Sequence, residues 1–293
     1  MIEILLVFSL AIGLAWPLGH YLAKVMRAAP MPGDRLFGWL EKPVYRLLGT
    51  DPRRGMTWRG YARAFLLSNL AVGALVWMLF MTQAWLPLNP DAVPNMRWDL
   101  ALHTMVSFLT NTNQQHYSGQ AQLSYLSQMV GIVGLQVATP MMGLALVVAT
   151  LRALFGGRDH NAHETGEADV GNYWADVTRA SVRFLLPLCL LWSVLLTSQG
   201  VPATLAAGPT VTPLDASAQM VEQKIPLGPV AAMVAVKQLG TNGGGWYGPN
   251  STVPLENPTP FSNFLETIGL ILIPLSVVFM VGPLVGRRKL STM

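Results

Sequence analysis

Two short polar segments contain the residue types that could do chemistry in this chain. The first, TNTNQQ, runs from Thr110 to Gln115, and the second, GTNGGG, runs from Gly240 to Gly245. Backbone carbonyls together with Thr and Asn oxygens can replace the water around a cation. Glycine permits the positive φ angles that turn successive carbonyls the same way. A glycine-rich turn of this kind fits either a phosphate-binding loop or a bend at membrane depth that presents carbonyls to an ion.

The charge of these two segments narrows the candidate ligands. Neither segment contains Asp or Glu. A divalent-cation site usually requires carboxylates, whereas K+ or Na+ suits neutral oxygens. The residues alone leave three interpretations open: conduction of a monovalent cation, a purely structural bend, or binding of another solute.

The elements that must position these segments are apolar. Of the 293 residues, 52% are hydrophobic and only 12% are charged, against roughly 25% charged in average soluble domains. About twenty consecutive apolar residues cross a bilayer as a helix. Five runs are predicted to do so: Ile4–Leu22, Tyr61–Trp85, Leu123–Leu151, Phe184–Thr197 (which contains Pro187 and extends upstream towards Val177) and Phe264–Val285. The sequence therefore predicts an all-α membrane protein.

A short half-apolar stretch precedes each polar segment. These stretches, Trp98–Leu109 and Gly228–Leu239, are too short to span a bilayer and are predicted to be re-entrant pore helices. Non-helical backbone at membrane depth persists only where it is buried in protein or lines a cavity. The two polar turns are therefore expected to line a cavity as filter loops.

The chain contains an internal repeat of helix, pore loop and helix. WRGYARA at 58–64 matches WADVTRA at 174–180, and TNTNQQHYSG at 110–119 resembles LGTNGGGWYG at 239–248. By residue type, Thr112-Asn113 aligns with Thr241-Asn242. The predicted organisation is an N-terminal transmembrane helix with a cytoplasmic loop (1–57), a first repeat (58–157), a cytoplasmic connection (158–173) and a second repeat (174–293).

The distribution of basic residues predicts the orientation. The net charge is +4 and the pI is near 9.4. If five helices alternate, all of the 19 Lys and Arg residues fall on one side except Arg97, Lys224 and Lys237. This is the positive-inside pattern, which places the N-terminus outside and the C-terminus in the cytoplasm. The bias indicates topology first and lipid-headgroup contact second, and it argues against nucleic-acid binding.

The other candidate motifs are interpreted as structural or incidental and not as functional sites. Cys189 is the only cysteine and is expected to pack in an apolar run. The TGE triplet at Thr165–Glu167 is interpreted as a solvated loop, because no Asp-Lys-Thr-Gly or Walker-type motif accompanies it. His160 and His163 are interpreted as an incidental pair. Lys237 precedes the second turn and is expected either to brace that loop or to snorkel.

The longest motifs resemble one known family. GPVAAMVAVKQLGTNGGGWYGPNSTVPLENPTPFSNFLE is similar to the second pore loop, and WDLALHTMVSFLTNTNQQHYSG to the first, of the potassium-binding A chain of the Kdp potassium-transporting ATPase. NPDAVPNMRWD, GNYWADVTRA and PLGHYLAKV also resemble that family, so the resemblance covers nearly the whole chain. It implies a membrane-embedded, non-hydrolysing subunit of a P-type ATPase complex in the bacterial inner membrane, with K+ as the transported ion.

The resemblance also implies site residues and partners. The ion-coordinating residues would be Thr110, Asn111, Thr112, Asn113, Gln114, Gly240, Thr241, Asn242, Gly243 and Gly244. In that family the chain selects K+ from outside and passes it to a separate P-type ATPase B chain, assisted by a small C chain. Gln114 departs from the aromatic residue that the family usually has there.

The number of repeats also departs from the family pattern. The family has four pore repeats around the ion, and this sequence contains two. A second chain is therefore expected to supply the missing repeats. The alternatives are a half-channel that dimerises into a passive K+ channel, and a nonfunctional truncated product.

Overall fold

The computed structural model describes residues 2–155, 168–215 and 220–291, and these residues are mostly helical. The long helices and their continuations are α1 (Ile2–Met26), α2 (Asp34–Leu47), α3 (Trp58–Thr82), η1 (Gln83–Trp85), η2 (Ser127–Ile132), α6 (Val133–Phe155), α7 (Tyr173–Arg179), η3 (Ala180–Leu185), α8 (Leu186–Ser198) and α10 (Pro260–Val285). The shorter elements are α4 (Trp98–Leu109), α5 (Gly119–Gln122), β1 (Thr210–Val211), β2 (Gln223–Lys224), α9 (Val230–Leu239), η5 (Pro249–Ser251) and η6 (Arg288–Ser291).

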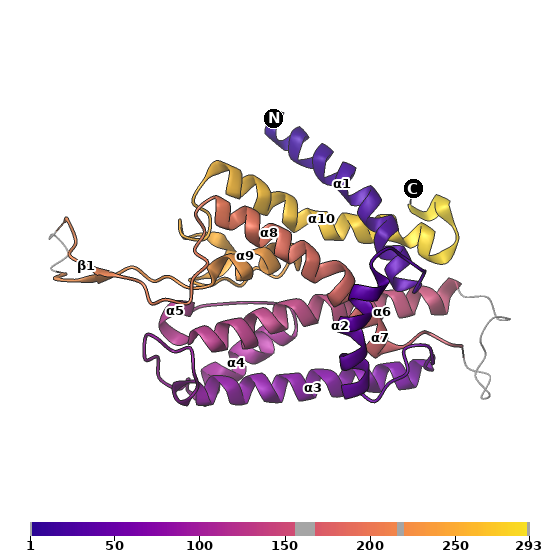
Figure 1. The fold of residues 1–293 in the computed structure, drawn as a ribbon, viewed down its shortest axis with the longest axis horizontal. Helices are drawn as coiled ribbons and strands as arrows, with labels where there is room; N and C mark the ends of the chain where they lie inside the picture. The colour runs from indigo at the N-terminus through magenta and orange to yellow at the C-terminus, as the bar shows by residue number, and fades with distance from the viewer. Residues whose placement is uncertain (1, 156–167, 216–219, 292–293) are drawn as a thin grey trace.

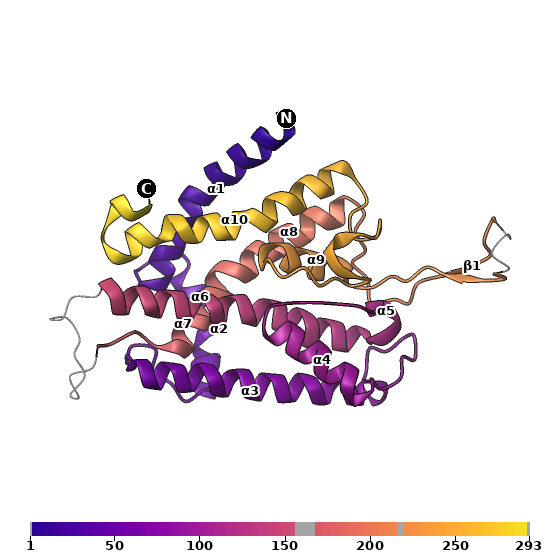
Figure 2. The same cartoon turned by 180° about the vertical axis from the view of Figure 1, so that it is seen from behind.

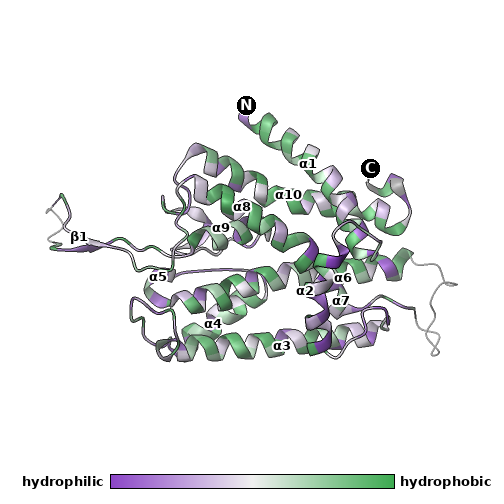
Figure 3. Ribbon diagram, in the orientation of Figure 1, coloured by the Kyte–Doolittle hydropathy of each residue, from purple (hydrophilic) through white to green (hydrophobic). Residues whose placement is uncertain are grey.

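The prediction of five membrane spans is confirmed. Within the described residues, five helices are long and apolar enough to cross a bilayer: Glu3–Met26, Trp58–Trp85, Ser127–Phe155, Tyr173–Ser198 and Pro260–Val285. Figure 3 shows hydrophobic residues along their lengths. The two short helices expected before the polar turns also form, as α4 and α9. The chain is therefore an all-α membrane protein that passes through the membrane several times.

The span that contains Pro187 is continuous despite its proline. Residues 180–185 form a π-helical segment, η3, between α7 and α8. A π-helical turn changes the backbone hydrogen-bond pattern and leaves room for other partners. The hydroxyl of Tyr21 on α1 donates a hydrogen bond of 2.8 Å to the Arg183 carbonyl in this segment. A neighbouring helix thus satisfies a carbonyl where the regular pattern is interrupted.

The two short helices lie inside the arrangement of the spans. Figure 1 shows α4 between α3 and α6, and α9 beside α8 and α10. Helix α6 contacts both α4 and α9, so one span supports both pore helices. Buried apolar side chains fill the space between these elements, including Phe108 on α4, Leu135 on α6 and Val234 on α9.

The last span, α10, begins with a capped first turn. Thr259 is the N-cap, and its side chain accepts a hydrogen bond of 3.0 Å from the Ser262 N–H. The Ser262 hydroxyl accepts in return from the Thr259 N–H, which completes a capping box. Pro260 occupies the first helical turn, where its missing N–H costs nothing. The position of that proline places the cap at Thr259.

A two-stranded hairpin extends from the chain between α8 and α9. Strands β1 and β2 pair antiparallel, with Thr210 opposite Lys224. Figures 1 and 2 show this hairpin, which is part of the α8–α9 connection, reaching beyond the ends of the helices. Lys224 forms an ion pair with Asp91, which precedes α4, so the hairpin base is tied to the first repeat.

Helix α2 lies within the segment that was predicted to be a cytoplasmic loop. Figure 1 shows it running across the direction of α3 and α6. Arg183 of η3 holds it through ion pairs with Asp34 (2.6 Å) and Glu41 (2.5 Å). The Met31 N–H and the Arg183 guanidinium both hydrogen-bond to Asp34 and lower the pKa of its carboxyl. Helix α2 has only 14 residues and many of them are polar, so it is not a membrane span by length or by hydropathy.

Three predictions concern residues outside those that the structure describes: TGE (Thr165–Glu167), the pair His160 and His163, and most of the 158–173 connection.

A buried ion pair joins α6 to α7 near the ends of their spans. The two guanidinium nitrogens of Arg152 donate to the two carboxylate oxygens of Asp176 at 2.5 and 3.0 Å. Asp176 also accepts a hydrogen bond of 3.0 Å from the Tyr61 hydroxyl of α3. Arg152 further donates to the Met26 carbonyl at the end of α1, at 2.7 Å. Arg152 and Asp176 together thus connect α1, α3, α6 and α7.

We predict that Arg152→Met destabilises the fold strongly, because it leaves Asp176 buried without its cation. The expected loss is about 3–5 kcal/mol, measured as a lowered thermal transition of the purified protein in detergent. Arg53→Met is the matched control, because the Arg53–Asp51 pair is exposed, at 88% and 49% of the two side chains. The control should lose less than about 1 kcal/mol. Equal transitions for the two variants would contradict this role of Arg152.

Candidate ion-binding site

Both short helices end in the same hydrogen-bonded motif. After α4, the N–H groups of Asn111 and Thr112 donate to the carbonyls of Phe108 (3.2 Å) and Ser107 (3.0 Å). After α9, the N–H groups of Thr241 and Asn242 donate to the carbonyls of Gln238 (3.2 Å) and Lys237 (3.1 Å). Both patterns are Schellman motifs, which end a helix through one left-handed residue.

The left-handed residues recur at alternate positions in both turns. Asn111 has φ of 58° and Asn113 of 53°, while Thr241 has φ of 55° and Gly243 of 91°. A β-branched residue such as Thr241 rarely adopts positive φ. The alternation is therefore built into both turns rather than being a property of glycine alone.

The hydrogen bonds also set the register between the two repeats. Asn111 occupies the same place as Thr241, and Thr112 the same place as Asn242. This register differs by one residue from the alignment by residue type, which paired Thr112 with Thr241. The structural register pairs Tyr117 with Tyr247, and it is set by the last turn of each helix. It also shows that Ser107 and Lys237 occupy equivalent positions.

The two turns meet side by side against α6. The Asn242 amide nitrogen lies 3.4 Å from the Asn111 side-chain oxygen and donates to the Gln136 carbonyl at 3.2 Å. Thr139 donates to the same Asn111 oxygen at 3.1 Å. The polar residues of α6 thus hold one side chain from each turn at a common point.

Further contacts fix the glycine-rich end of the second turn. The Gln136 side-chain amide donates to the Gly244 carbonyl at 2.7 Å, and the Asn250 N–H donates to the Gly243 carbonyl at 2.8 Å. The Gln115 side chain accepts from the Gly245 N–H at 3.0 Å. A Cβ at Gly244 would lie 2.5 Å from the Phe108 ring, so only glycine fits there.

The remaining carbonyls of the turns have no such partners. Among the described residues, none donates a hydrogen bond to the carbonyl oxygens of Thr110, Asn111, Thr112, Asn113, Thr241 and Asn242. The buried side chain of Asn113 and the side-chain oxygen of Asn242 also have no partner in the described part of the chain. Buried polar groups are normally satisfied. This set of neutral oxygens fits a monovalent cation.

A buried ion pair supports the second turn from behind. Lys237 and Glu256 are both fully buried, and their charged atoms are 2.6 Å apart. Lys237 also contacts the Ser251 hydroxyl, and Glu256 accepts the Tyr247 N–H at 2.9 Å. Lys237 therefore braces the loop and does not snorkel. In the first repeat, the equivalent Ser107 donates its hydroxyl to the Gln114 carbonyl at 3.0 Å.

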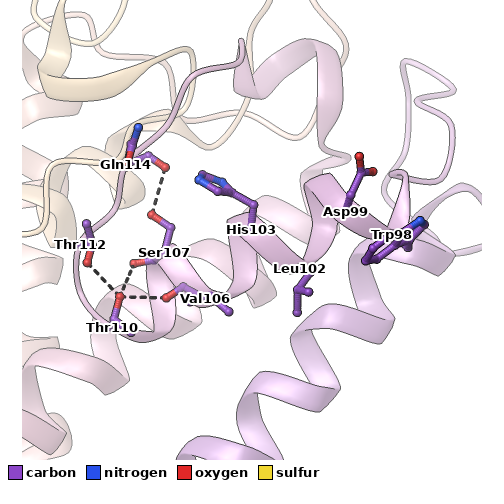
Figure 4. Close-up of a pocket in the computed structure, with 9 residues that line it drawn as sticks. All are labelled: Trp98, Asp99, Leu102, His103, Val106, Ser107, Thr110, Thr112 and Gln114. Atoms are coloured by element: carbon purple, nitrogen blue, oxygen red, sulfur yellow. Dashed lines mark hydrogen bonds between the residues drawn. The ribbon is translucent and has the colours of Figure 1, made fainter.

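The first turn borders an open hollow of about 460 Å³. Figure 4 shows the hollow along one flank of α4, with Thr110 and Thr112 at one end and Trp98 and Asp99 at the other. Its lining consists of Trp98, Asp99, Leu102, His103, Val106, Ser107, Thr110, Thr112 and Gln114. His103 lies on this flank rather than in the core.

The structure brings most of the residues that the sequence singled out to one place. Residues 110–114 and 240–244 form two adjacent turns, although the carbonyls of Gln114, Gly240, Gly243 and Gly244 already accept hydrogen bonds within the protein. Sequence reasoning missed Gln136, Thr139 and Glu256. Gln136 lies in the middle of a mostly apolar span, and a polar residue at that depth is a signal that could have pointed to it.

We predict that Lys237→Met destabilises the protein by about 3–5 kcal/mol, because Glu256 stays buried without a cation. Adding Glu256→Gln removes that charge and keeps an oxygen for the Tyr247 N–H, so the double variant should recover part of the loss. Thermal transitions of the wild type, both single variants and the double variant give the coupling. Additive losses would show that the pair does not brace the loop.

The chain resembles known proteins over nearly its whole length. Residues 5–293 match the model of the family described as "Potassium-transporting ATPase A subunit". The chain is 44% identical over 292 residues to the potassium-transporting ATPase potassium-binding subunit of Pseudomonas aeruginosa, covering 99% of this chain and 50% of the relative. The subunit of the same name from Desulfovibrio desulfuricans is 42% identical over 292 residues, covering 98% and 49%.

The subunit from Alicyclobacillus acidocaldarius is 40% identical over 291 residues, covering 99% of this chain and 50% of the relative. The chain therefore spans about half the length of the curated relatives that it matches. By the extent of the family match and by these identities, the chain belongs to the potassium-transporting ATPase A subunit family.

Proposed function

We propose that the two turns form part of a K+-selective site through which the protein takes up K+ from outside. The observation that carries this proposal is the set of unpartnered carbonyls after two equivalent helix ends that meet side by side. The relatives are named as potassium-binding subunits. In this proposal K+ is the transported substrate, and its ligands are the carbonyl oxygens of Thr110–Asn113, Thr241 and Asn242.

The direction of the pore helices supports a cation at this place. The C-terminal ends of α4 and α9 lead directly into the turns. A helix C-terminus carries a partial negative charge of roughly half an elementary charge. Two such ends favour a cation without adding a carboxylate, and this suits an ion that must leave again.

The protein is proposed to work as a non-hydrolysing subunit of an ATP-driven complex. A separate P-type ATPase B chain and a small C chain would be its partners, in the bacterial inner membrane. The name of these relatives, potassium-transporting ATPase potassium-binding subunit, supports membership of such an ATPase complex. The distribution of Lys and Arg supports an outer N-terminus and a cytoplasmic C-terminus.

Further polypeptide is proposed to complete the ring around the ion. The hollow beside Thr110 and Thr112 is open on the flank of α4, and an ion held only by these turns would face it. A polypeptide carrying two more pore repeats would close that side, as would a second copy of this chain in a passive channel. Crosslinking in native membranes followed by mass measurement distinguishes these two arrangements.

We predict that Gly243→Ala weakens K+ binding by about 5- to 30-fold. The φ of Gly243 is 91°, and a side chain in left-handed backbone costs roughly 1–2 kcal/mol. The protein is purified together with its membrane partners, and its thermal transition is measured at increasing K+ concentrations, with Na+ as the competing ion. The K+ concentration that gives half of the maximal rise in the transition temperature reports the affinity.

Gly248→Ala is the matched control in the same loop. Its φ is −171°, and an added Cβ would meet no atom within 4 Å. The control should bind K+ within about twofold of the wild type, because extended backbone accepts alanine. If both variants bind K+ as the wild type does, the second turn is not part of the ion site.

We also predict the orientation in the membrane. Two variants, Arg53→Cys and Val221→Cys, are each made in a Cys189→Ala background. They should react differently with an impermeant thiol reagent applied from outside. Both side chains are exposed, at 88% for Arg53 and 81% for the Val221 residue. The cysteine at position 221 should react in intact cells, and the one at position 53 only after lysis. The opposite result would reverse the proposed orientation.

A further inference from the structure

Helix α2 presents three different rows of side chains. Asp34, Glu41 and Tyr45 form the first row. One position further along the chain, Arg35, Lys42 and Arg46 form a second, which we call the basic row. Leu36, Trp39, Leu40 and Leu47 form a third, the apolar row. Residues three, four or seven apart share a helix face, so each row is a continuous stripe.

The first row faces the protein and fixes the rotation of the helix. Glu41 and Tyr45 are 4% and 8% exposed. Arg183 of η3 pairs with both Asp34 and Glu41, and its guanidinium lies 5.6 Å from the centre of the Phe37 ring. Two ion pairs to one arginine hold α2 against η3, so the other two rows have defined directions.

The apolar row faces away from the rest of the chain. Leu36, Trp39 and Leu47 are 63%, 71% and 87% exposed. A contiguous exposed apolar stripe marks a surface that another apolar phase covers. The helix follows the span α1 after a short connection and runs across the direction of α3 and α6 (Figures 1 and 2). A helix that crosses the spans in this way lies along the membrane plane.

The basic row adjoins the apolar row and lacks acidic partners. Arg35, Lys42 and Arg46 are exposed and form no ion pair with any described residue. The acidic groups of α2, Asp34 and Glu41, are both engaged by Arg183. The outer surface of the helix is therefore cationic beside an apolar stripe that contains a tryptophan. This combination is typical of helices that lie in the bilayer interface.

We propose that α2 is an interfacial helix that binds anionic phospholipid. The apolar row contacts acyl chains just below the headgroups, and the basic row contacts headgroup phosphates. Trp39 lies at the boundary, where tryptophan is favoured. By the positive-inside bias, this surface belongs to the cytoplasmic leaflet, whose anionic lipids attract Lys and Arg. The proposal does not depend on K+ binding by the two turns.

The first test measures where the apolar row lies. Trp39→Cys in a Cys189→Ala background is labelled with an environment-sensitive fluorophore, and the protein is reconstituted with its membrane partners in phosphatidylcholine–phosphatidylglycerol vesicles. Lipids brominated near the headgroup should quench the label, and aqueous iodide should not. Leu36→Cys serves as a second position in the same row in case Trp39→Cys does not fold. Quenching by iodide alone, or by neither reagent, would show water or protein over this face and overturn the proposal.

The second test measures the lipid preference. The variant Arg35→Gln/Lys42→Gln/Arg46→Gln should lose its preference for phosphatidylglycerol over phosphatidylcholine by about fivefold for each charge removed, measured from the lipids that copurify with the protein. The matched control is Arg53→Gln/Arg54→Gln/Arg59→Gln, which removes three charges from the same predicted side but outside α2. An equal loss in both variants would show a general charge effect and contradict a specific surface on α2.

Discussion

Backbone that leaves the helical conformation between apolar spans needs a partner for each of its polar groups. This constraint governs the arrangement around the two turns. The carbonyls of Gly243 and Gly244 are satisfied by Asn250 and Gln136. Those between Thr110 and Asn113, and those of Thr241 and Asn242, are left for something other than the described protein. The proposed K+ ion would be the partner for these carbonyl oxygens.

The two repeats brace their turns from the same helix position, occupied by Ser107 in the first and Lys237 in the second, but through different kinds of contact. Ser107 uses a hydroxyl that reaches the adjacent loop, whereas Lys237 uses a buried ion pair with Glu256, far along the following loop. The second loop is longer and contains three consecutive glycines, so its backbone loses more entropy on ordering. The buried ion pair between Lys237 and Glu256 offsets this entropic cost. The repeat is therefore conserved in backbone geometry while its supporting contacts differ.

The sequence was sufficient to predict the spans, the two short helices and the position of the turns. Long apolar runs and the half-length stretches before TNTNQQ and GTNGGG carry those signals directly. The register between the turns could not be read correctly, because residue type aligned Thr112 with Thr241 while the hydrogen bonds of each helix end pair Thr112 with Asn242. The partner of Lys237 was also hidden, since ion pairs between distant residues depend on the folded chain. Helix α2 was not predicted from hydropathy, because acidic, basic and apolar residues follow one another within each of its turns.

In the proposed site, the two turns hold K+ with backbone oxygens. The most direct measurement is anomalous diffraction from crystals of the protein, assembled with its membrane partners, in which Tl+ replaces K+. Coordination by the two turns predicts Tl+ density between residues 110–113 and 241–242, and that density should disappear on back-exchange with K+ but not with Na+. Tl+ density confined to other parts of the complex, with none at the two turns, would contradict it.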